Sequence, residues 1–255
     1  LCHASLIDGA RQSGATLRVY PHNNLRKLER LLADNRANLP AEGRLLVVTE
    51  SVFSMDGDRS PLPEIVELVE QHGALLLLDE AHAVGVLGPA GQGLAGELGL
   101  QGRITFQMGT LGKAVGSAGG YLAADRKWID LILNGARSFI YSTAPPPSQV
   151  AASRCGLEVI SSSRGRKLRE RLWSNISTLS RLRKTEAHSA IIPLLLGENE
   201  SALQAARSLL ESGYLAPAIR FPTVPRDSAR LRITLSSLHE EKHIAGLNEK
   251  LLTLG

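Results

Sequence analysis

The stretch Ala74-Leu-Leu-Leu-Leu-Asp-Glu-Ala-His82 decides the fold class of this 255-residue chain. Five apolar residues in a row, followed at once by acids, predict a strand that is buried on both faces and ends at Asp79. Arg44–Glu50 (RLLVVTE) is a second run of this kind, and a predicted helix over Pro61–His72 separates the two. A strand, a helix and a strand in this order are typical of a parallel sheet.

The same alternation extends on both sides of this stretch. It predicts strands over Thr16–Tyr20, Ile104–Met108 and Tyr121–Ala124, and helices over Asn23–Asn35 and Asp125–Ala136. After Pro145-Pro146-Pro147 the pattern changes to helices over Ser148–Ser161, Lys167–Thr185, Ser201–Ser212 and Glu240–Leu252, with strands over Ala190–Leu196 and Leu231–Leu235. We therefore expect an α/β protein, with a large domain over 1–160 around a mostly parallel sheet and a smaller α+β domain over 161–255.

Composition narrows the classes of function. The net charge is only +4, acids and bases are interleaved as in Arg169-Glu170-Arg171, and the ten aromatic residues are few for base stacking. No apolar run approaches the roughly 18–20 residues of a membrane span. We expect small-molecule substrates, with no nucleic acid and no membrane as partner.

The cysteines and methionines give two further expectations. Cys2 and Cys155 have no metal-site spacing, which predicts no metal and a reducing, cytoplasmic location. Residue 1 is Leu and the methionines stand at positions 55 and 108, so we expect an N-terminally truncated piece of a longer protein.

Polar residues follow three of the predicted parallel strands, where open α/β sheets bind their ligands. They are Ser54 after the first strand, Asp79 and His82 after the second, and Thr110 and Lys113 after the third. We expect them to converge on one crevice. Taken alone, Asp79 is more often a helix N-cap after a strand, and His82 a surface residue.

Asp79-Glu-Ala-His82 resembles the magnesium-binding box of helicases, but that function requires an upstream phosphate loop ending in Gly-Lys. The Gly-Lys pair of this chain, Gly112-Lys113, lies downstream, and Gln107 stands where the loop needs glycine. The NTPase hypothesis is therefore rejected.

Lys113 lies in the glycine-rich segment Gly109–Gly116, whose backbone amides could approach an anion. Small and apolar neighbours predict that burial lowers its pKa, and a neutral amine can bond an aldehyde cofactor. An isolated lysine would more often be an ordinary turn residue. An acid at one strand end and a lysine at the next together suit pyridoxal phosphate (PLP), which needs an amine for its aldehyde and a carboxylate for its pyridinium nitrogen.

Five segments in register resemble the α-oxoamine synthases, the fold-type I PLP-dependent acyltransferases, and the resemblance runs over essentially the whole chain. The segments are His3-Ala-Ser-Leu-Ile-Asp8, Thr49-Glu-Ser-Val-Phe-Ser-Met-Asp-Gly-Asp58, Asp79-Glu-Ala-His-Ala-Val-Gly-Val-Leu-Gly88, Gly109-Thr-Leu-Gly-Lys113 and Phe139-Ile-Tyr-Ser-Thr143.

The resemblance implies a role for each candidate residue. In the predicted large domain, Lys113 is the Schiff-base lysine and general base, and Asp79 pairs with the pyridine nitrogen. His82 and Ser54 contact the phenolic oxygen of the cofactor. Thr110 contacts its phosphate, and His3 stacks on its ring and contacts the substrate. In the predicted small domain, Arg232 holds the substrate carboxylate, and Thr223 and Arg220 lie in substrate-binding segments. Without the resemblance, these two arginines would be interpreted as ordinary surface residues.

By this resemblance the reaction condenses L-alanine with a pimeloyl thioester, releasing thiol and CO₂, to give 8-amino-7-oxononanoate for biotin synthesis. The family also implies a homodimer. Three alternatives stay open: a glycine C-acetyltransferase, a 5-aminolaevulinate-type synthase, and an inactive fragment. The family carries a segment ahead of the position of His3, with a phosphate-binding loop.

Overall fold

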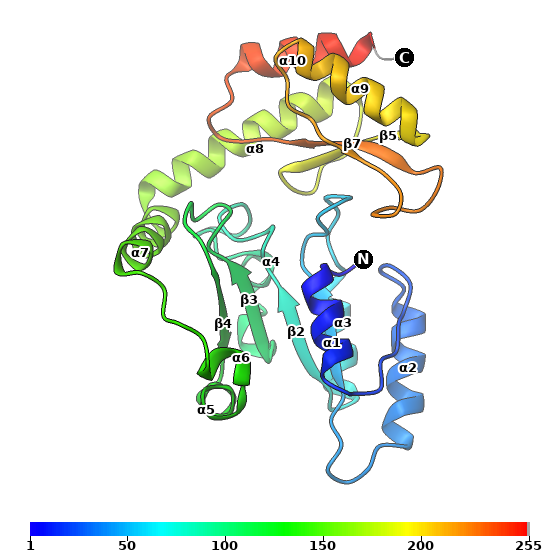
Figure 1. Ribbon diagram of the computed structural model, residues 1–255, viewed down its shortest axis with the longest axis vertical. Coiled ribbons are helices and arrows are strands. Elements are labelled where there is room, and N and C mark those ends of the chain that lie inside the picture. The colour runs from blue at the N-terminus through cyan, green and yellow to red at the C-terminus, as the bar shows by residue number, and fades with distance from the viewer. Residues whose placement is uncertain (254–255) are drawn as a thin grey trace. The chain divides into compact units, whose positions relative to one another are not determined.

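The computed structural model describes residues 1–253 (Figure 1). The chain folds into two compact units. Unit 1 comprises residues 1–52 and 59–165, and unit 2 comprises residues 53–58 together with the chain from residue 166 onward. The short segment 53–58 therefore leaves unit 1 between two of its strands and returns to it.

Unit 1 is built on a four-stranded sheet in the order β1-β2-β3-β4. Its strands are β1 (Leu46–Glu50), β2 (Leu75–Asp79), β3 (Phe106–Thr110) and β4 (Gly120–Ala124). The first three run parallel, as the sequence predicts, and β4 is antiparallel to β3. Figure 1 shows β2 and β3 ending at the same edge of the sheet.

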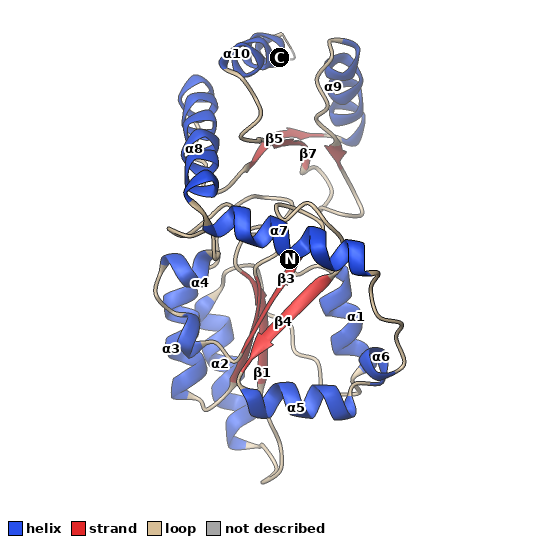
Figure 2. Cartoon of the chain, turned by 90° about the vertical axis from the view of Figure 1, so that its left-hand side faces the viewer, coloured by secondary structure: helices blue, strands red, loops and turns tan. Residues whose placement is uncertain are grey.

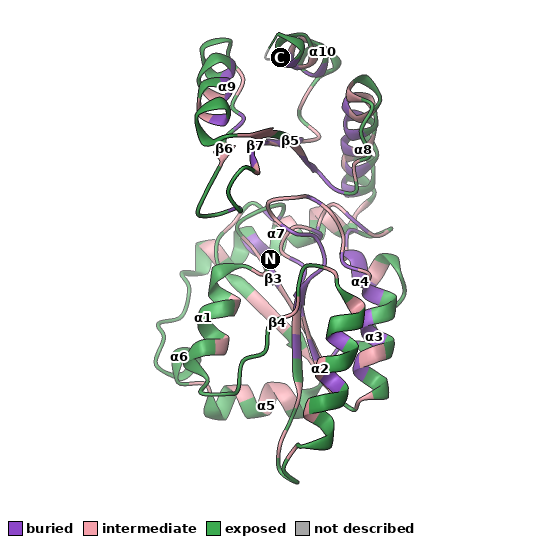
Figure 3. Ribbon diagram, turned by 90° about the vertical axis from the view of Figure 1, so that its right-hand side faces the viewer, coloured by how far each residue is buried: buried purple, intermediate pink, exposed green. Residues whose placement is uncertain are grey.

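Helices cover both faces of this sheet (Figures 2 and 3). The helices of unit 1 are α1 (Ala4–Gln12), α2 (Leu25–Ala37), α3 (Leu62–Gln71), α4 (Leu94–Glu97), α5 (Arg126–Gly135), α6 (Arg137–Ile140) and α7 (Pro147–Ser161), with a 3₁₀ turn over Gln101–Arg103. Figures 2 and 3 place α1 on one face and α2, α3 and α4 on the other.

The core of unit 1 lies between α3 and the centre of the sheet. Leu62 and Val66 of α3 and Leu76 and Leu78 of β2 are fully buried. Figure 3 shows the buried stripe along α3. Burying a leucine or valine side chain contributes about 1.5–3 kcal/mol, so this interface anchors β2 and, with it, the position of Asp79.

One predicted strand of unit 1 is wrong. Thr16–Tyr20 forms no strand, although its residues favour one. A strand is stabilised by its ladder partner, and within the described part of the chain β1 pairs with β2 alone. The local preference of Thr16–Tyr20 is therefore not supported by pairing.

Unit 2 contains an antiparallel sheet in the order β5-β7-β6, formed by β5 (Ile191–Gly197), β6 (Ala218–Ile219) and β7 (Ala229–Thr234). Its helices are α8 (Ser163–Arg183), which begins in the last residues of unit 1, α9 (Asn199–Glu211) and α10 (Glu241–Leu252). Leu209 of α9, Leu231 of β7 and Leu251 of α10 are buried in its core. None of the helices described is long and apolar enough to cross a membrane.

Candidate active site

Asp79 ends β2 at the centre of the carboxyl edge of the sheet in unit 1. Its side chain is buried, and its Oδ1 accepts a hydrogen bond of 2.8 Å from the backbone N–H of Ala81. Its carbonyl oxygen accepts one of 2.9 Å from the N–H of Ser51, and Glu80 N–H donates to the carbonyl of Met108 at 2.8 Å. These bonds fix the ends of β1, β2 and β3 in line and turn the chain toward His82.

His82 and Lys113 meet at this edge. Lys113 Nζ lies 3.0 Å from His82 Nε2, although the two residues follow different strands. His82 is half-buried and Lys113 is exposed. The predicted burial of the Lys113 side chain is therefore not found in this chain, because its neighbours Gly112 and Ala114 are too small to cover a long side chain.

The loop that carries Lys113 is closed by its own hydrogen bonds. Leu111 N–H donates to the carbonyl of Gly119, and Ser117 N–H donates to the carbonyl of Leu111, each at 2.8 Å. Thr110 Oγ1 accepts from Gly112 N–H at 3.1 Å and donates to the carbonyl of Gly119 at 3.2 Å. Thr110 thus shapes the loop, and its predicted phosphate contact stays a prediction.

Helix α7 supports this loop from the side. Ser117 Oγ donates to the carbonyl of Gln149 at 3.1 Å, and Gln149 Nε2 donates to the carbonyl of Ala118 at 2.9 Å. At Gly156 a Cβ would collide with the carbonyl oxygen of Val115, so glycine permits the close packing. Lys113 is therefore presented from a braced loop rather than from a mobile one.

Two further carboxyl groups are buried beside Asp79, and they differ in their partners. Glu80 Oε1 and Oε2 accept from the N–H groups of Ala95 and Leu94, at 2.8 Å and 3.0 Å, so Glu80 organises the start of α4. Burial raises its pKa. Glu50, the register partner of Asp79 on β1, is 2% exposed, and its Oε1 has no hydrogen-bond partner among the described residues.

Glu50 is the residue that the sequence analysis missed. Burial, followed by the charge of Asp79, raises its pKa to about 7. A signal was present in the sequence, because Glu50 closes the apolar run RLLVVTE as Asp79 closes ALLLLD. An acid that ends a buried strand is a candidate for the carboxyl edge wherever it occurs.

His3 stands immediately before α1 and caps it. Its Nδ1 accepts from the N–H of Ser5 at 3.3 Å and lies 2.8 Å from Ser5 Oγ. The imidazole is exposed, and the His3 backbone N–H donates to the Glu50 carboxyl group. His3 is thereby tied to the end of β1, while its predicted stacking on a cofactor ring stays a prediction.

Ser54 and Arg232 lie together in unit 2. Arg232 Nε donates to the carbonyl of Ser54 at 2.6 Å, and burial lowers the pKa of Arg232. Arg230, 6% exposed, forms an ion pair with Asp56. Ser189 Oγ donates to the carbonyl of Gly57 at 2.8 Å. These contacts hold the segment 53–58 against β5 and β7.

Thr223 and Arg220 lie in the turn that follows β6. Thr223 N–H donates to the carbonyl of Arg220 at 2.9 Å, and both side chains are exposed. The structure thus groups the candidates by unit: Asp79, His82, Thr110, Lys113 and His3 in unit 1, and Ser54, Arg232, Thr223 and Arg220 in unit 2.

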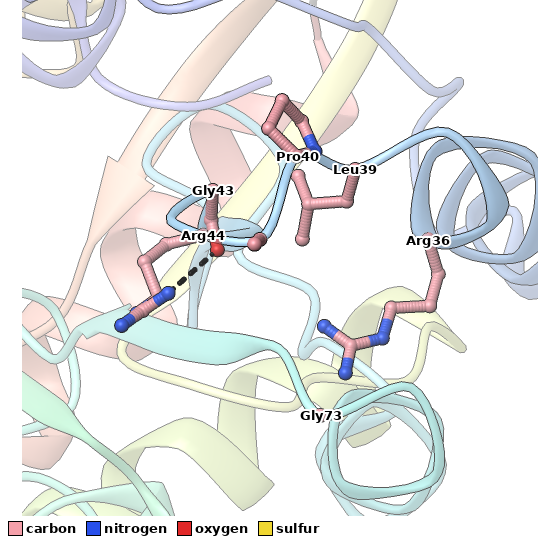
Figure 4. A pocket seen from close by; sticks show the side chains of 7 residues that line it. Arg36, Leu39, Pro40, Gly43, Arg44 and Gly73 are labelled. Carbon is pink, nitrogen blue, oxygen red and sulfur yellow. Dashed lines mark hydrogen bonds between the residues drawn. The ribbon is translucent and has the colours of Figure 1, made fainter.

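A cavity of about 480 Å³ in unit 1 lies elsewhere (Figure 4). It is lined by Arg36, Leu39, Pro40, Ala41, Gly43, Arg44 and Gly73. Arg44 and Gly73 precede β1 and β2, so this cavity is at the amino edge of the sheet, and none of the candidate residues lines it. In the described chain, no cluster of three or more His, Cys, Asp or Glu side chains could hold a metal ion.

Known proteins resemble this chain along its whole length. An 8-amino-7-oxononanoate synthase of Geobacter sulfurreducens is 46% identical over 251 residues, which are 96% of this chain and 63% of that protein. A structure of serine palmitoyltransferase (SPT) with PLP is 33% identical, with a TM-score of 0.92, and matches 100% of this chain and 64% of that one. A structure of 8-amino-7-oxononanoate synthase from Francisella tularensis is 27% identical, with a TM-score of 0.80, and matches 99% of this chain and 71% of that one.

These likenesses confirm the predicted α/β fold class and agree with the motif resemblance. The chain spans less than two thirds of the length of the first curated relatives that it matches. The sequence profile of the aminotransferase class I and II family matches residues 1–251, and the chain belongs to that family.

Proposed function

We propose that this chain is part of a PLP-dependent acyltransferase of the 8-amino-7-oxononanoate synthase type. The observation that carries the proposal is the contact between Lys113 Nζ and His82 Nε2, 3.0 Å, at the edge where the buried carboxylate Asp79 ends the central strand. An amine for the aldehyde and a carboxylate for the pyridine nitrogen are the groups that PLP requires, and here they stand at neighbouring strand ends with an imidazole beside the amine. The names of the relatives support the same activity.

The residues of unit 1 fit this cofactor, and Ser54 of unit 2 is added from the motif resemblance. We assign Lys113 to its aldehyde, Asp79 to its pyridine nitrogen, His82 and Ser54 to its phenolic oxygen, Thr110 to its phosphate, and His3 to the face of its ring. The closed, glycine-rich loop over residues 109–119 supplies backbone N–H groups suited to an anion. When bound, PLP supplies an electron-accepting ring that stabilises negative charge on the α-carbon of an amino acid.

Lys113 and His82 handle the proton in this proposal. Lys113 removes the α-proton of the amino acid as general base. His82 Nε2 either accepts a hydrogen bond from the Lys113 ammonium or donates one to its neutral amine, according to the imidazole tautomer. Asp79 is held by Ala81 N–H at 2.8 Å, so its carboxylate keeps one orientation while the proton moves.

The substrates we propose are L-alanine and a pimeloyl thioester, and the products are 8-amino-7-oxononanoate, the free thiol and CO₂. Arg232 suits the amino-acid carboxylate. Its Nε is held by the carbonyl of Ser54, and no described residue accepts a hydrogen bond from its two terminal nitrogens. An arginine held in this way can bind a carboxylate. Thr223 and Arg220 are proposed to contact the substrate.

We further propose a cytoplasmic homodimer. Large apolar side chains of α5, α6 and the residue after α6 are solvent-exposed in the single chain: Leu131 61%, Phe139 58% and Tyr141 75%. Such side chains are typical of surfaces covered by a partner. Both cysteines in the described chain are free thiols, which suits a reducing compartment.

A second candidate is another acyltransferase of the same type with a different amino acid or acyl group. The likeness to SPT with PLP favours keeping it, and a glycine C-acetyltransferase is one such enzyme. The two are separated by supplying alanine or glycine with pimeloyl or acetyl thioesters and measuring thiol release. Release with alanine and pimeloyl thioester supports the first candidate, and release only with glycine and acetyl thioester overturns it.

The cofactor is tested separately from the substrates. Adding PLP to the purified chain should produce a near-visible absorbance band that Lys113→Ala lacks. A wild-type chain without such a band would contradict cofactor binding by this chain.

A further inference from the structure

Two glutamates in unit 1 are equally buried but differ in use. Glu50 and Glu80 are each 2% exposed. Both oxygens of Glu80 accept backbone hydrogen bonds from α4, so neither oxygen of this buried carboxyl group lacks a partner. Glu50 Oε1 accepts none from the described residues. A buried polar atom without a partner is costly, which indicates that it is retained for another reason.

The position of Glu50 connects two candidate residues of the site. Glu50 and Asp79 are register partners on adjacent parallel strands, so their side chains emerge on the same face at the carboxyl edge. The Glu50 carboxyl group also accepts the backbone N–H of His3, directly before α1. Glu50 therefore links the end of β1 to the start of α1, beside Asp79.

We propose that Glu50 is a positioning residue of this site, acting as a neutral carboxylic acid that fixes the backbone of His3 and keeps a second negative charge away from Asp79. The proposal rests on the proposed function, because it assigns Glu50 a part in holding the same cofactor. An ionised carboxylate with an unpaired buried oxygen would be unfavourable here, whereas a neutral acid tolerates the site.

The charged groups around Glu50 act in both directions. Asp79, on β2, disfavours its ionisation, while the amino group of Leu1, ahead of α1, and Lys113, after β3, favour it. The thiol of Cys2 is another titratable neighbour, and burial raises its pKa. His3 contacts Glu50 through its backbone N–H. Burial is the largest influence on Glu50, and all these influences together raise its pKa to about 7. Ionisation above this pH adds a like charge beside Asp79.

The test compares wild type with Glu50→Gln, Glu50→Leu and the control Glu80→Gln, using PLP as the probe. The PLP affinity of each chain is measured by absorbance titration at pH values on both sides of 7. Gln keeps the carbonyl that accepts the His3 N–H but cannot ionise. Leu has no carbonyl to accept this hydrogen bond and also cannot ionise. Any pH dependence of PLP or of Lys113 itself is common to all four chains, so the differences between them isolate Glu50.

We expect the affinity of wild type to fall severalfold as the pH rises through 7. Glu50→Gln should keep the low-pH affinity and lose this fall, and Glu50→Leu should bind severalfold more weakly at every pH. Glu80→Gln should keep the wild-type pH profile. The proposal is overturned if Glu50→Gln retains the wild-type fall, or if Glu50→Leu and Glu50→Gln bind alike.

A second measurement keeps the two proposals distinguishable. If wild type binds no PLP, the proposed function fails for this chain, and urea unfolding of the cofactor-free proteins decides the ionisation of Glu50. A fall in wild-type stability between acidic and neutral pH that Glu50→Gln removes supports a neutral Glu50. Parallel pH profiles of stability for wild type and Glu50→Gln overturn it.

Discussion

Lys113 Nζ lies 3.0 Å from His82 Nε2, although 31 positions separate the two residues in the sequence. The parallel pairing of β2 with β3 brings them together, because each follows its strand at the same edge of the sheet. Their contact places an amine beside an imidazole at that edge, and it is the basis for the predictions on binding.

Arg232 should control the affinity for the amino acid. Replacing it by lysine keeps the charge but removes the fork that binds a carboxylate through two nitrogens, and it also removes the hydrogen bond to Ser54. We expect the KM for the amino acid to rise about tenfold or more, since charge-assisted hydrogen bonds contribute roughly 1.5–3 kcal/mol. Steady-state kinetics measure it. Arg207→Lys, on the exposed surface of α9, is the control and should be neutral.

Glu50 should make stability depend on pH. Its pKa is about 7 in the folded chain and 4.5 as the ordinary value. Its contribution is therefore fully present below pH 4.5, declines as the pH rises, and is lost above 7. The difference between these two pKa values corresponds to a change of at most about 3 kcal/mol in the free energy of unfolding. Urea unfolding at several pH values should show this decline for wild type and a flatter profile for Glu50→Gln.

Asp56 should stabilise unit 2 through Arg230. Asp56→Asn leaves the guanidinium of Arg230, whose side chain is 7% exposed, without its ion-pair partner. Removing one partner of a buried pair costs about 3–5 kcal/mol, and the partial exposure of Asp56 reduces the expected loss to about 2 kcal/mol. Asp130→Asn breaks the exposed pair with Arg126 and should cost about 0.5 kcal/mol or less. Equal losses in urea unfolding would contradict the assignment.

Gly57 should tolerate no side chain. Its φ is +69°, and a Cβ would collide with the carbonyl oxygen of Ile191, a backbone atom that cannot turn away. Gly57→Ala is expected to destabilise the chain by about 2–4 kcal/mol, through strain and overpacking together. Gly213 also has a positive φ, +86°, but open space around it, so Gly213→Ala should cost only about 1 kcal/mol. Thermal unfolding of both variants provides the comparison.

The parallel strands of unit 1 could be predicted because RLLVVTE and ALLLLD contain continuous apolar runs. Such runs are buried whichever residues far away in the sequence pack against them. The Thr16–Tyr20 strand could not be excluded, because strand formation depends on a partner outside the segment. Segment 53–58 lies between strands of unit 1, and its contacts with Arg230 and Arg232 span more than 170 positions. No local pattern reveals such a contact.

Among the candidate residues, too, some could be predicted from the local sequence and others depend on contacts that the local sequence does not reveal. Asp79 and Lys113 could be predicted because an acid and a lysine at neighbouring strand ends have a specific use. The sequence placed Glu50 at the carboxyl edge but did not indicate a use for it, because a single acid without a matching partner specifies no chemistry. Its Oε1 without a hydrogen-bond partner is visible only once the strands are paired. The exposure of Lys113 could not be anticipated, because sequence neighbours do not determine what covers a side chain.

The central claim is that Lys113 bonds the aldehyde of PLP, and borohydride reduction tests it most directly. The chain is incubated with PLP and reduced, so that the imine between amine and aldehyde becomes a stable secondary amine, and its peptides are mapped by mass spectrometry. We predict one stoichiometric pyridoxyl group on the peptide containing Lys113, and its loss in Lys113→Ala. Labelling spread over exposed lysines such as Lys127 and Lys184, or a label that persists in Lys113→Ala, would contradict the account.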